Sequence, residues 1–257
     1  MAQDSDEPLI IHAVERALRV LQVFGPDHPA MTLSEIAQAV GLSRATARRN
    51  LMTFEHLGFI RREGRLFSPT PRVLQLGYAY ISSLPFWERA QPHIRELSDA
   101  LEESSSIAVF DSPDIVYVVR VPSLRPLSLS LTIGSRLPAY ATSMGLVLLS
   151  GLTPAELDSY LENVVLERLS PNTITDKDRL RSVISVARTD GYAISNGSRE
   201  LGVLSVAAPI VDRKGHIIAA LNVSTNAARI SMEDLRERIL PRVRATAKLI
   251  SDELAYI

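Results

Sequence analysis

The 257-residue sequence contains no cysteine, which excludes disulfides, cysteine-ligated zinc, iron–sulfur clusters and thiol catalysis. Lysine is scarce too, because all but three of the 28 basic residues are arginine. No apolar run approaches the roughly 18 residues of a membrane span, and the acidic N-terminus is unlike a secretory signal. We therefore expect a soluble cytoplasmic protein with no membrane partner.

Motifs of catalysis and metal binding are missing as well. The five histidines are scattered, none has metal-ligand spacing, and GxSxG, GxGxxG and Walker A motifs do not occur. Asp111 and Asp114 bracket a predicted turn, where backbone capping explains them better than acid–base chemistry. We expect no enzyme activity, no cofactor and no metal site.

Positive charge is concentrated in one short stretch. The whole chain has a formal net charge of −1, yet residues 32–72 carry seven arginines and three glutamates, a local charge of +4. The planar guanidinium of arginine suits bidentate contacts to phosphate or guanine. This local excess favours a nucleic-acid-binding segment, although an ordinary solvated helix face is the simpler alternative for such a charge run.

Two consecutive helices are predicted within this stretch. Thr32 and Glu35 form a capping box for a first helix, which ends at Gly41. Ser43 caps a second helix over residues 44–57, apolar on one face and basic on the other. An upstream helix is expected to complete the core with the apolar residues Ala13, Ala17, Val20, Leu21 and Phe24. This order is the sequence form of a helix-turn-helix.

A hairpin follows, with Glu63-Gly64 at its expected tip, and it resembles the wing of a winged helix. We therefore predict a winged helix-turn-helix DNA-binding domain over residues 1–70. The second helix would enter the major groove and contact base edges through Arg44, Thr46 and Arg48. The predicted DNA-binding set also includes Ala45, on the same exposed face, and the phosphate or minor-groove candidates Arg49, Arg61, Arg62 and Arg65.

Residues 71–85 are predicted to form a connecting helix that Pro71 opens and Leu84-Pro85 ends. Its large apolar residues would be exposed on an isolated chain, so we expect this helix to pack against a second subunit and form a homodimer.

Residues 86–257 mix strands and helices, which predicts an α+β domain around a central antiparallel sheet. The predicted strands are residues 105–110, 114–121, 127–132, 202–212 and 216–225. The predicted helices are residues 86–103, 153–161 and 176–191, the last capped by Thr175, and a region from Ser231 that kinks or breaks near Pro241.

Polar residues occur on strand faces that are otherwise apolar. Ser205, Asn222 and Ser224 alternate with residues that we expect to be covered, and covered polar groups need partners. Upstream, Thr142 and Ser143 stand at a helix start, where free N–H groups attract anions. A small cavity for a carboxylate ligand would explain both features. Simple capping and bonding to neighbouring main chain is the alternative.

Four segments resemble the IclR family of bacterial transcriptional regulators: TLSEIAQAVGLSRATARRNLMTFEHLGFI, PRVLQLGYAYISSLP, AQPHIRELSDALEESSSIAVFD and, above all, GSRLPAYATSMGLVLLSGL. Within the family, the chain is similar to the subgroup that controls protocatechuate and β-ketoadipate catabolism. The resemblance implies an N-terminal winged helix-turn-helix, a C-terminal effector domain of GAF-like topology, dimers or dimers of dimers on double-stranded operator DNA, and a small organic acid as effector.

The same resemblance places an effector site in the C-terminal domain. The expected site residues are Tyr140, Thr142, Ser143, Met144, Gly145, Ser195, Asn196, Ser205, Asn222 and Ser224. Four positions depart from the subgroup pattern: Leu146 and Leu204 replace arginines, and Asn196 and Ser198 replace acidic residues. These changes are expected to alter affinity for a dicarboxylate.

The predicted function is therefore a sequence-specific transcriptional regulator whose operator binding is modulated by a small organic acid and which controls aromatic-acid catabolism genes. The alternative is an effector-independent DNA-binding protein whose C-terminal domain serves only oligomerisation.

Overall fold

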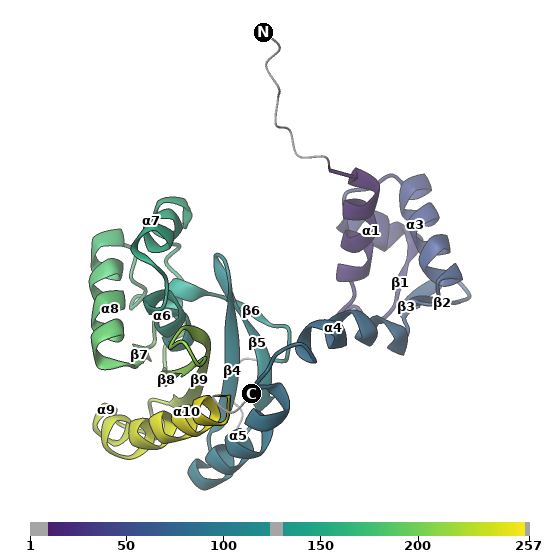
Figure 1. Cartoon of the computed structure of the whole chain (residues 1–257). Helices are drawn as coiled ribbons and strands as arrows, with labels where there is room; N and C mark the ends of the chain where they lie inside the picture. Colours follow the sequence, from purple (N-terminus) through teal and green to yellow (C-terminus); the bar gives the residue numbers. More distant parts are fainter. Residues whose placement is uncertain (1–9, 124–130, 255–257) are drawn as a thin grey trace. The chain divides into compact units, whose positions relative to one another are not determined.

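The computed structural model describes residues 10–123 and 131–254, and the chain divides into two compact units, Met1–Ser83 and Leu84–Ile257 (Figure 1). The predicted connector, residues 71–85, belongs almost wholly to the first unit. No helix in the described ranges is long and apolar enough to cross a membrane.

The first unit is a small helical domain with a three-stranded antiparallel sheet in the order β1-β3-β2. Its elements are α1 (His12–Gln22), β1 (Met31–Thr32), α2 (Leu33–Ala39), α3 (Arg44–His56), β2 (Ile60–Glu63), β3 (Leu66–Pro69), η1 (Pro71–Val73) and α4 (Leu74–Ile81). The winged helix-turn-helix prediction is confirmed by this order of elements.

The N-terminal caps of α2 and α3 form as the sequence predicts. Glu35 accepts a hydrogen bond from the backbone N–H of Thr32 at 2.7 Å, and hydrogen bonds from Thr32 lower the pKa of its carboxyl. Gly41 has a φ of +64°, a conformation that glycine adopts without strain, and so ends the first helix. The hydroxyl of Ser43 accepts from the N–H of Thr46 at 3.2 Å. These caps fix the angle at which α3 leaves α2.

The core of this unit forms where one face of α3 meets α1 and α2. Ala47, Leu51 and Phe54 are buried, as predicted. Ala13 was expected in the core and is exposed, because it lies near the start of α1, whose only buried residue is Val20. The wing also differs by one residue from expectation: Glu63 pairs with Leu66, so its tip is Gly64-Arg65.

The second unit is built on a six-stranded, fully antiparallel sheet in the order β6-β5-β4-β9-β8-β7. The elements are α5 (Trp87–Leu101), β4 (Ser104–Asp111), β5 (Asp114–Val121), β6 (Arg136–Pro138), η2 (Ala139–Ala141), α6 (Ser143–Ser150), α7 (Pro154–Asn163), α8 (Lys177–Asp190), β7 (Ala193–Asn196), β8 (Val203–Val211), β9 (Ile217–Asn226), α9 (Met232–Asp234), η3 (Leu235–Ile239) and α10 (Leu240–Leu254).

Helices cover both faces of this sheet (Figure 1). Apolar residues of α5 and α10 pack on one face, around Ile94, Leu221 and Val243. Helices α6, α7 and α8 pack on the other, around Leu149 and Ile184. Alternating side chains of β8 and β9 therefore enter two separate cores, and the predicted α+β class is confirmed.

Several predictions at the ends of elements need correction. Asp176 caps α8 in place of Thr175, because its carboxylate accepts from the N–H of Arg179 at 2.7 Å. The short strands β6 and β7 had not been predicted. The expected strand over residues 127–132 falls mostly outside the described residues. Near Pro241 the helix does not end, because the π-helical turn η3 leads into α10.

Candidate nucleic-acid interface and ligand cavity

The outer face of α3 carries exposed basic side chains. Arg44, Ala45, Arg48 and Arg49 are exposed and Thr46 is half-buried. Within the described part of the chain, the three arginines make no side-chain hydrogen bond or ion pair. Because a guanidinium has five N–H donors, this face offers many unused donors to an acidic or hydrogen-bonding surface.

The arginines of the wing are held to different degrees. Arg61 donates to Ser68 Oγ at 3.1 Å and lies 3.3 Å from Glu63 Oε1. Arg62 donates to the carbonyl of Gly64 at 3.0 Å and stacks over Phe67. Arg65 projects from the tip and has no side-chain partner among the described residues. The wing thus presents one unpaired and two partly engaged cations.

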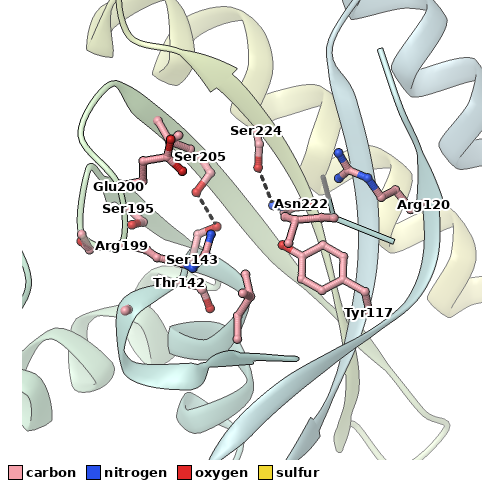
Figure 2. A pocket seen from close by; sticks show the side chains of 15 residues that line it. Tyr117, Arg120, Thr142, Ser143, Ser195, Arg199, Glu200, Ser205, Asn222 and Ser224 are labelled. Atoms are coloured by element: carbon pink, nitrogen blue, oxygen red, sulfur yellow. Dashed lines mark hydrogen bonds between the residues drawn. The ribbon is translucent and has the colours of Figure 1, made fainter. Parts of the chain in front are cut away.

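The second unit contains a cavity of about 60 Å³ between the sheet, the start of α6 and the loop between β7 and β8 (Figure 2). A cavity of this size has room for several water molecules. It is lined by Tyr117, Arg120, Leu131, Leu137, Ala141, Thr142, Ser143, Ser195, Ser198, Arg199, Glu200, Val203, Ser205, Asn222 and Ser224.

Six of the ten expected site residues line this cavity: Thr142, Ser143, Ser195, Ser205, Asn222 and Ser224. The other four do not, and their contacts explain why. Gly145 permits close packing, because a Cβ there would lie 2.0 Å from the carbonyl oxygen of Ala139. Met144 is buried in the core beside α6.

Tyr140 and Asn196 hold the framework around the cavity. The Tyr140 hydroxyl donates to the carbonyl of Glu167 and accepts from its N–H, both at 3.0 Å. Asn196 has an exposed side chain, and its carbonyl accepts from Asn172 Nδ2 at 3.1 Å. Leu146 and Leu204, two of the positions expected to depart from the subgroup pattern, are buried in opposite cores and do not line the cavity.

Strand register assembles a polar floor for the cavity. Ser195 pairs with Ser205, Ser205 pairs with Ser224, and Ser224 pairs with Ser104. Residues directly opposite in neighbouring strands point to the same face. A row of four serines therefore crosses β7, β8, β9 and β4.

A second polar row lies beside the first, where Arg120 pairs with Ser106 and Ser106 with Asn222. Tyr117 reaches the same face although it is three residues from Arg120, an odd spacing that places residues on opposite faces of a regular strand. The register shifts between Ile107 and Ala108, and this bulge adds one residue to β5. The irregularity brings both side chains to the cavity.

The cavity wall on the α6 side contributes hydroxyl groups and backbone donors. Thr142 Oγ1 accepts from the N–H of Gly145 at 3.0 Å and caps the helix. Ser143 Oγ lies 3.0 Å from Ser205 Oγ (Figure 2). The N–H groups of Ser143 and Met144, in the first turn, have no intrahelical acceptor. This wall is suited to bind an anion.

Charged and buried polar side chains also line the cavity. Arg120 donates to Ser106 Oγ at 3.1 Å, and burial lowers its pKa. Burial also raises the pKa of Tyr117 to about 12, so its phenol remains protonated at neutral pH. Asn222 donates from Nδ2 to Ser224 Oγ at 2.9 Å, while its buried Oδ1 has no hydrogen-bond partner among residues 10–123 and 131–254. Arg199 and Glu200 line the opposite side.

Five polar or charged lining residues were not predicted from the sequence to belong to the site: Tyr117, Arg120, Ser198, Arg199 and Glu200. Strand alternation could not reveal Tyr117 and Arg120, because the bulge interrupts it. The signal for Arg199 and Glu200 was their place between two glycines at a hairpin, which is a common position for a loop over a site.

The described residues contain no group of three or more His, Asp or Glu side chains that could hold a metal ion. The arrangement consists of two arginines, one glutamate, hydroxyl groups, an amide and a helix start, and it can bind a small anion that carries further polar groups.

A basic winged helix-turn-helix joined to an α+β domain with a polar cavity is the organisation of a two-domain transcriptional regulator. Comparison with known proteins agrees: the IclR helix-turn-helix domain matches residues 13–64, and the bacterial transcriptional regulator IclR C-terminal domain matches residues 78–252. The chain belongs to the IclR family of DNA-binding transcriptional regulators.

Two curated relatives share most of the chain. It is 35% identical to the Pca regulon regulatory protein of Pseudomonas putida over 249 residues, which covers 96% of this chain and 86% of the relative. It is 33% identical to the p-hydroxybenzoate hydroxylase transcriptional activator of Acinetobacter baylyi over 242 residues, with 92% and 89% covered.

Solved structures show the same architecture. A transcriptional regulator from Rhodococcus sp. RHA1 is 47% identical, with a TM-score of 0.86 over 96% of this chain and 99% of that one. An IclR homolog from Microbacterium hydrocarbonoxydans, complexed with 4-hydroxybenzoate, is 26% identical, with a TM-score of 0.84 over 95% and 100%.

Proposed function

We propose that this regulator binds a small organic acid in the cavity of its second unit, that this binding changes its affinity for operator DNA, and that it controls genes of aromatic-acid catabolism. One observation carries the proposal: Asn222 lines a cavity that also contains arginines and the start of a helix, and its buried Oδ1 lacks a partner in the part of the chain that the structure describes. A buried polar atom without a partner is costly, and a ligand donor would remove that cost.

The carboxylate of the effector binds at the α6 wall, where the N–H groups of the first turn and the Ser143–Ser205 hydroxyl pair provide donors. Arg199 supplies charge from the loop across the cavity. A hydroxyl group elsewhere on the effector donates to Asn222 Oδ1. A para-hydroxylated aromatic acid has both groups at opposite ends of a rigid ring.

The relatives support the choice of ligand class. One is the activator for p-hydroxybenzoate hydroxylase, and one related structure contains 4-hydroxybenzoate. The four departures from the subgroup pattern limit how far the relatives' ligand can be assigned to this chain. Of the four residues, only Ser198 lines the cavity.

On DNA, α3 occupies the major groove. Arg44, Thr46 and Arg48 contact base edges, whereas Arg49, Arg61, Arg62 and Arg65 contact phosphates or the minor groove. The exposure of the α3 arginines and the absence of side-chain partners for them in the described ranges support DNA contact by this helix.

The protein acts as a homodimer or a dimer of dimers. Helix α4 exposes Leu74, Leu76, Tyr78 and Tyr80, each at least 50% exposed in the single chain. Apolar side chains gathered on one short helix are typical of an association surface. Two recognition helices would then read half-sites about 34 Å apart, and the effector would change operator affinity by altering their spacing.

Thermal unfolding tests the effector site directly. The purified protein is heated with protocatechuate, β-ketoadipate, 4-hydroxybenzoate, other benzoates, glyoxylate and pyruvate in separate samples. A ligand at about 100 times its Kd adds roughly 2.7 kcal/mol of stability and raises the midpoint by several degrees. A flat panel would instead favour the alternative, an effector-independent DNA-binding protein whose second domain serves only oligomerisation.

A further inference from the structure

A second chain segment lies against the loop that carries the charged wall of the cavity. The loop joins β7 to β8 and brings Ser198, Arg199 and Glu200 to the cavity. Two glycines with positive φ, Gly197 at +67° and Gly202 at +82°, flank these residues. Since glycine adopts such conformations freely, both ends of the loop favour hinge-like freedom unless other contacts restrain them.

Two buried hydroxyl groups provide such contacts. Ser170 Oγ donates to the carbonyl of Gly197 at 2.6 Å, and Thr173 Oγ1 donates to the carbonyl of Ser198 at 2.6 Å. Ser170 is 7% exposed and Thr173 is 6% exposed. We call this pair, with its two acceptors, the hydroxyl clasp.

Hydrogen bonds within residues 170–173 orient the two hydroxyl groups of the clasp. Thr173 Oγ1 accepts from the N–H of Ser170 at 2.7 Å, and Ser170 Oγ accepts from the N–H of Asn172 at 3.0 Å. These backbone donors orient both oxygens, so that the hydroxyl protons are left to point at the loop carbonyls. Asn172 adds a bond just before the loop, from Nδ2 to the carbonyl of Asn196 at the end of β7.

The segment that carries the clasp is also attached to the opposite wall. Tyr140, three residues before the start of α6, holds both backbone groups of Glu167. The segment of residues 167–173 is therefore hydrogen-bonded at one end to Tyr140, beside the start of α6, and at the other end to the backbone of Gly197 and Ser198. Neither Ser170 nor Thr173 lines the cavity.

We propose that Ser170 and Thr173 are positioning residues for the effector: through their hydrogen bonds to Gly197 and Ser198, they hold Arg199 over the cavity. The inference rests on the effector site proposed above. The hydroxyl clasp contributes to affinity for a carboxylate without touching it, because a loop that is already ordered loses less conformational freedom when the ligand binds.

Thr173→Val tests this role, since it removes the hydroxyl and keeps the shape of the side chain. We expect the Kd for 4-hydroxybenzoate, measured by calorimetry on the full-length protein, to rise about fivefold, the value of one neutral hydrogen bond. Thr173→Ser should restore binding to within about twofold of wild type. Thr175→Val is the matched control, because Thr175 is exposed close to the same segment and its hydroxyl accepts from Arg168 at 3.3 Å rather than donating to a loop carbonyl.

A double-mutant cycle separates positioning from general destabilisation. If the clasp acts through Arg199, Thr173→Val should have little further effect on the Kd in an Arg199→Ala background. A fully additive loss, or a wild-type Kd for Thr173→Val alone, would overturn the proposal.

Hydrogen exchange gives a readout that does not depend on any ligand. Amides of residues 197–203 should exchange faster in Thr173→Val than in wild type, while those of α10 remain unchanged. Unchanged exchange in the loop would refute the clasp even if 4-hydroxybenzoate binds. If no acid binds wild type, the proposed effector function fails, and this exchange experiment still decides whether the clasp orders the loop.

Discussion

Ser143 and Ser205 are 62 residues apart in the chain, and their hydroxyl oxygens lie 3.0 Å apart at the wall of the cavity. In such a pair one hydroxyl donates and the other accepts, so the accepting group keeps its own proton for a third partner. The contact joins α6 to β8 and leaves one hydroxyl donor for a ligand. In the proposed effector site, the same two side chains therefore serve both helix packing and ligand recognition.

Replacing Asn222 should separate effector response from DNA binding. Asn222→Leu removes the unpartnered Oδ1 and the hydrogen bond to Ser224, and it leaves the first unit untouched. We expect operator binding without effector to persist and the effect of 4-hydroxybenzoate on it to disappear, as measured by fluorescence anisotropy. A response that survives the substitution would remove Asn222 from the site.

Gly145→Ala should destabilise the second unit. The added Cβ would lie 2.0 Å from the backbone oxygen of Ala139, which cannot move away as a flexible side chain would. We expect a loss of about 3 kcal/mol in the free energy of unfolding, the upper end of the usual cost of overpacking.

Chemical denaturation checks this value, with Gly25→Ala as control. No atom lies within 4 Å of the position that a Cβ on Gly25 would occupy, and this residue does not need a positive φ. Its substitution should leave stability unchanged or slightly higher. If both substitutions changed the free energy of unfolding equally, close packing against Ala139 would not explain the glycine at position 145.

Base and phosphate contacts should respond differently to substitution. Arg48→Ala should weaken operator binding by about 1–3 kcal/mol and random DNA much less, because a base contact carries sequence information. Arg65→Ala should weaken both alike and reduce the salt dependence of binding, since a phosphate contact releases counterions. Arg213→Ala, in an exposed turn of the second unit, is the control. Equal losses on both DNAs for Arg48→Ala would make Arg48 a phosphate contact.

Stability should decline at high pH partly through Tyr117. Burial raises its pKa from 10.0 to about 12, so the unfolded chain loses this proton at lower pH than the folded protein does. The resulting contribution to the free energy of unfolding is constant below about pH 10 and falls as the pH rises from 10 to about 12. Urea denaturation should show a shallower decline for Tyr117→Phe over that range. Parallel curves would contradict a buried phenol at this site.

Local signals in the sequence were sufficient for the DNA-binding unit. The capping box at Thr32 and Glu35 and the cap at Ser43 involve residues three apart, and both form. In the second unit, the incorrect cap at Thr175 shows where such local signals fail. Asp176 is an equally good capping residue one position later, and it is the residue that caps α8.

The cavity could be predicted only in part. Alternation placed Ser205, Asn222 and Ser224 on one covered face, but it could not align them with Ser104, Ser106 and Ser195, which depend on strand register. Motif resemblance also selected Gly145 and Tyr140, whose contacts are structural. Resemblance thus selected residues around the cavity without separating those that line it from those that support its wall.

The central claim is that an organic acid in the cavity controls DNA binding by the first unit. The most direct test is to titrate 4-hydroxybenzoate, protocatechuate and β-ketoadipate into the protein on labelled operator DNA and to measure the operator Kd at fixed salt. We predict that at least one acid changes this Kd by about 5-fold to 150-fold, the usual range of allosteric coupling, and that Asn222→Leu abolishes the change. An operator Kd that none of the three acids alters would contradict the account.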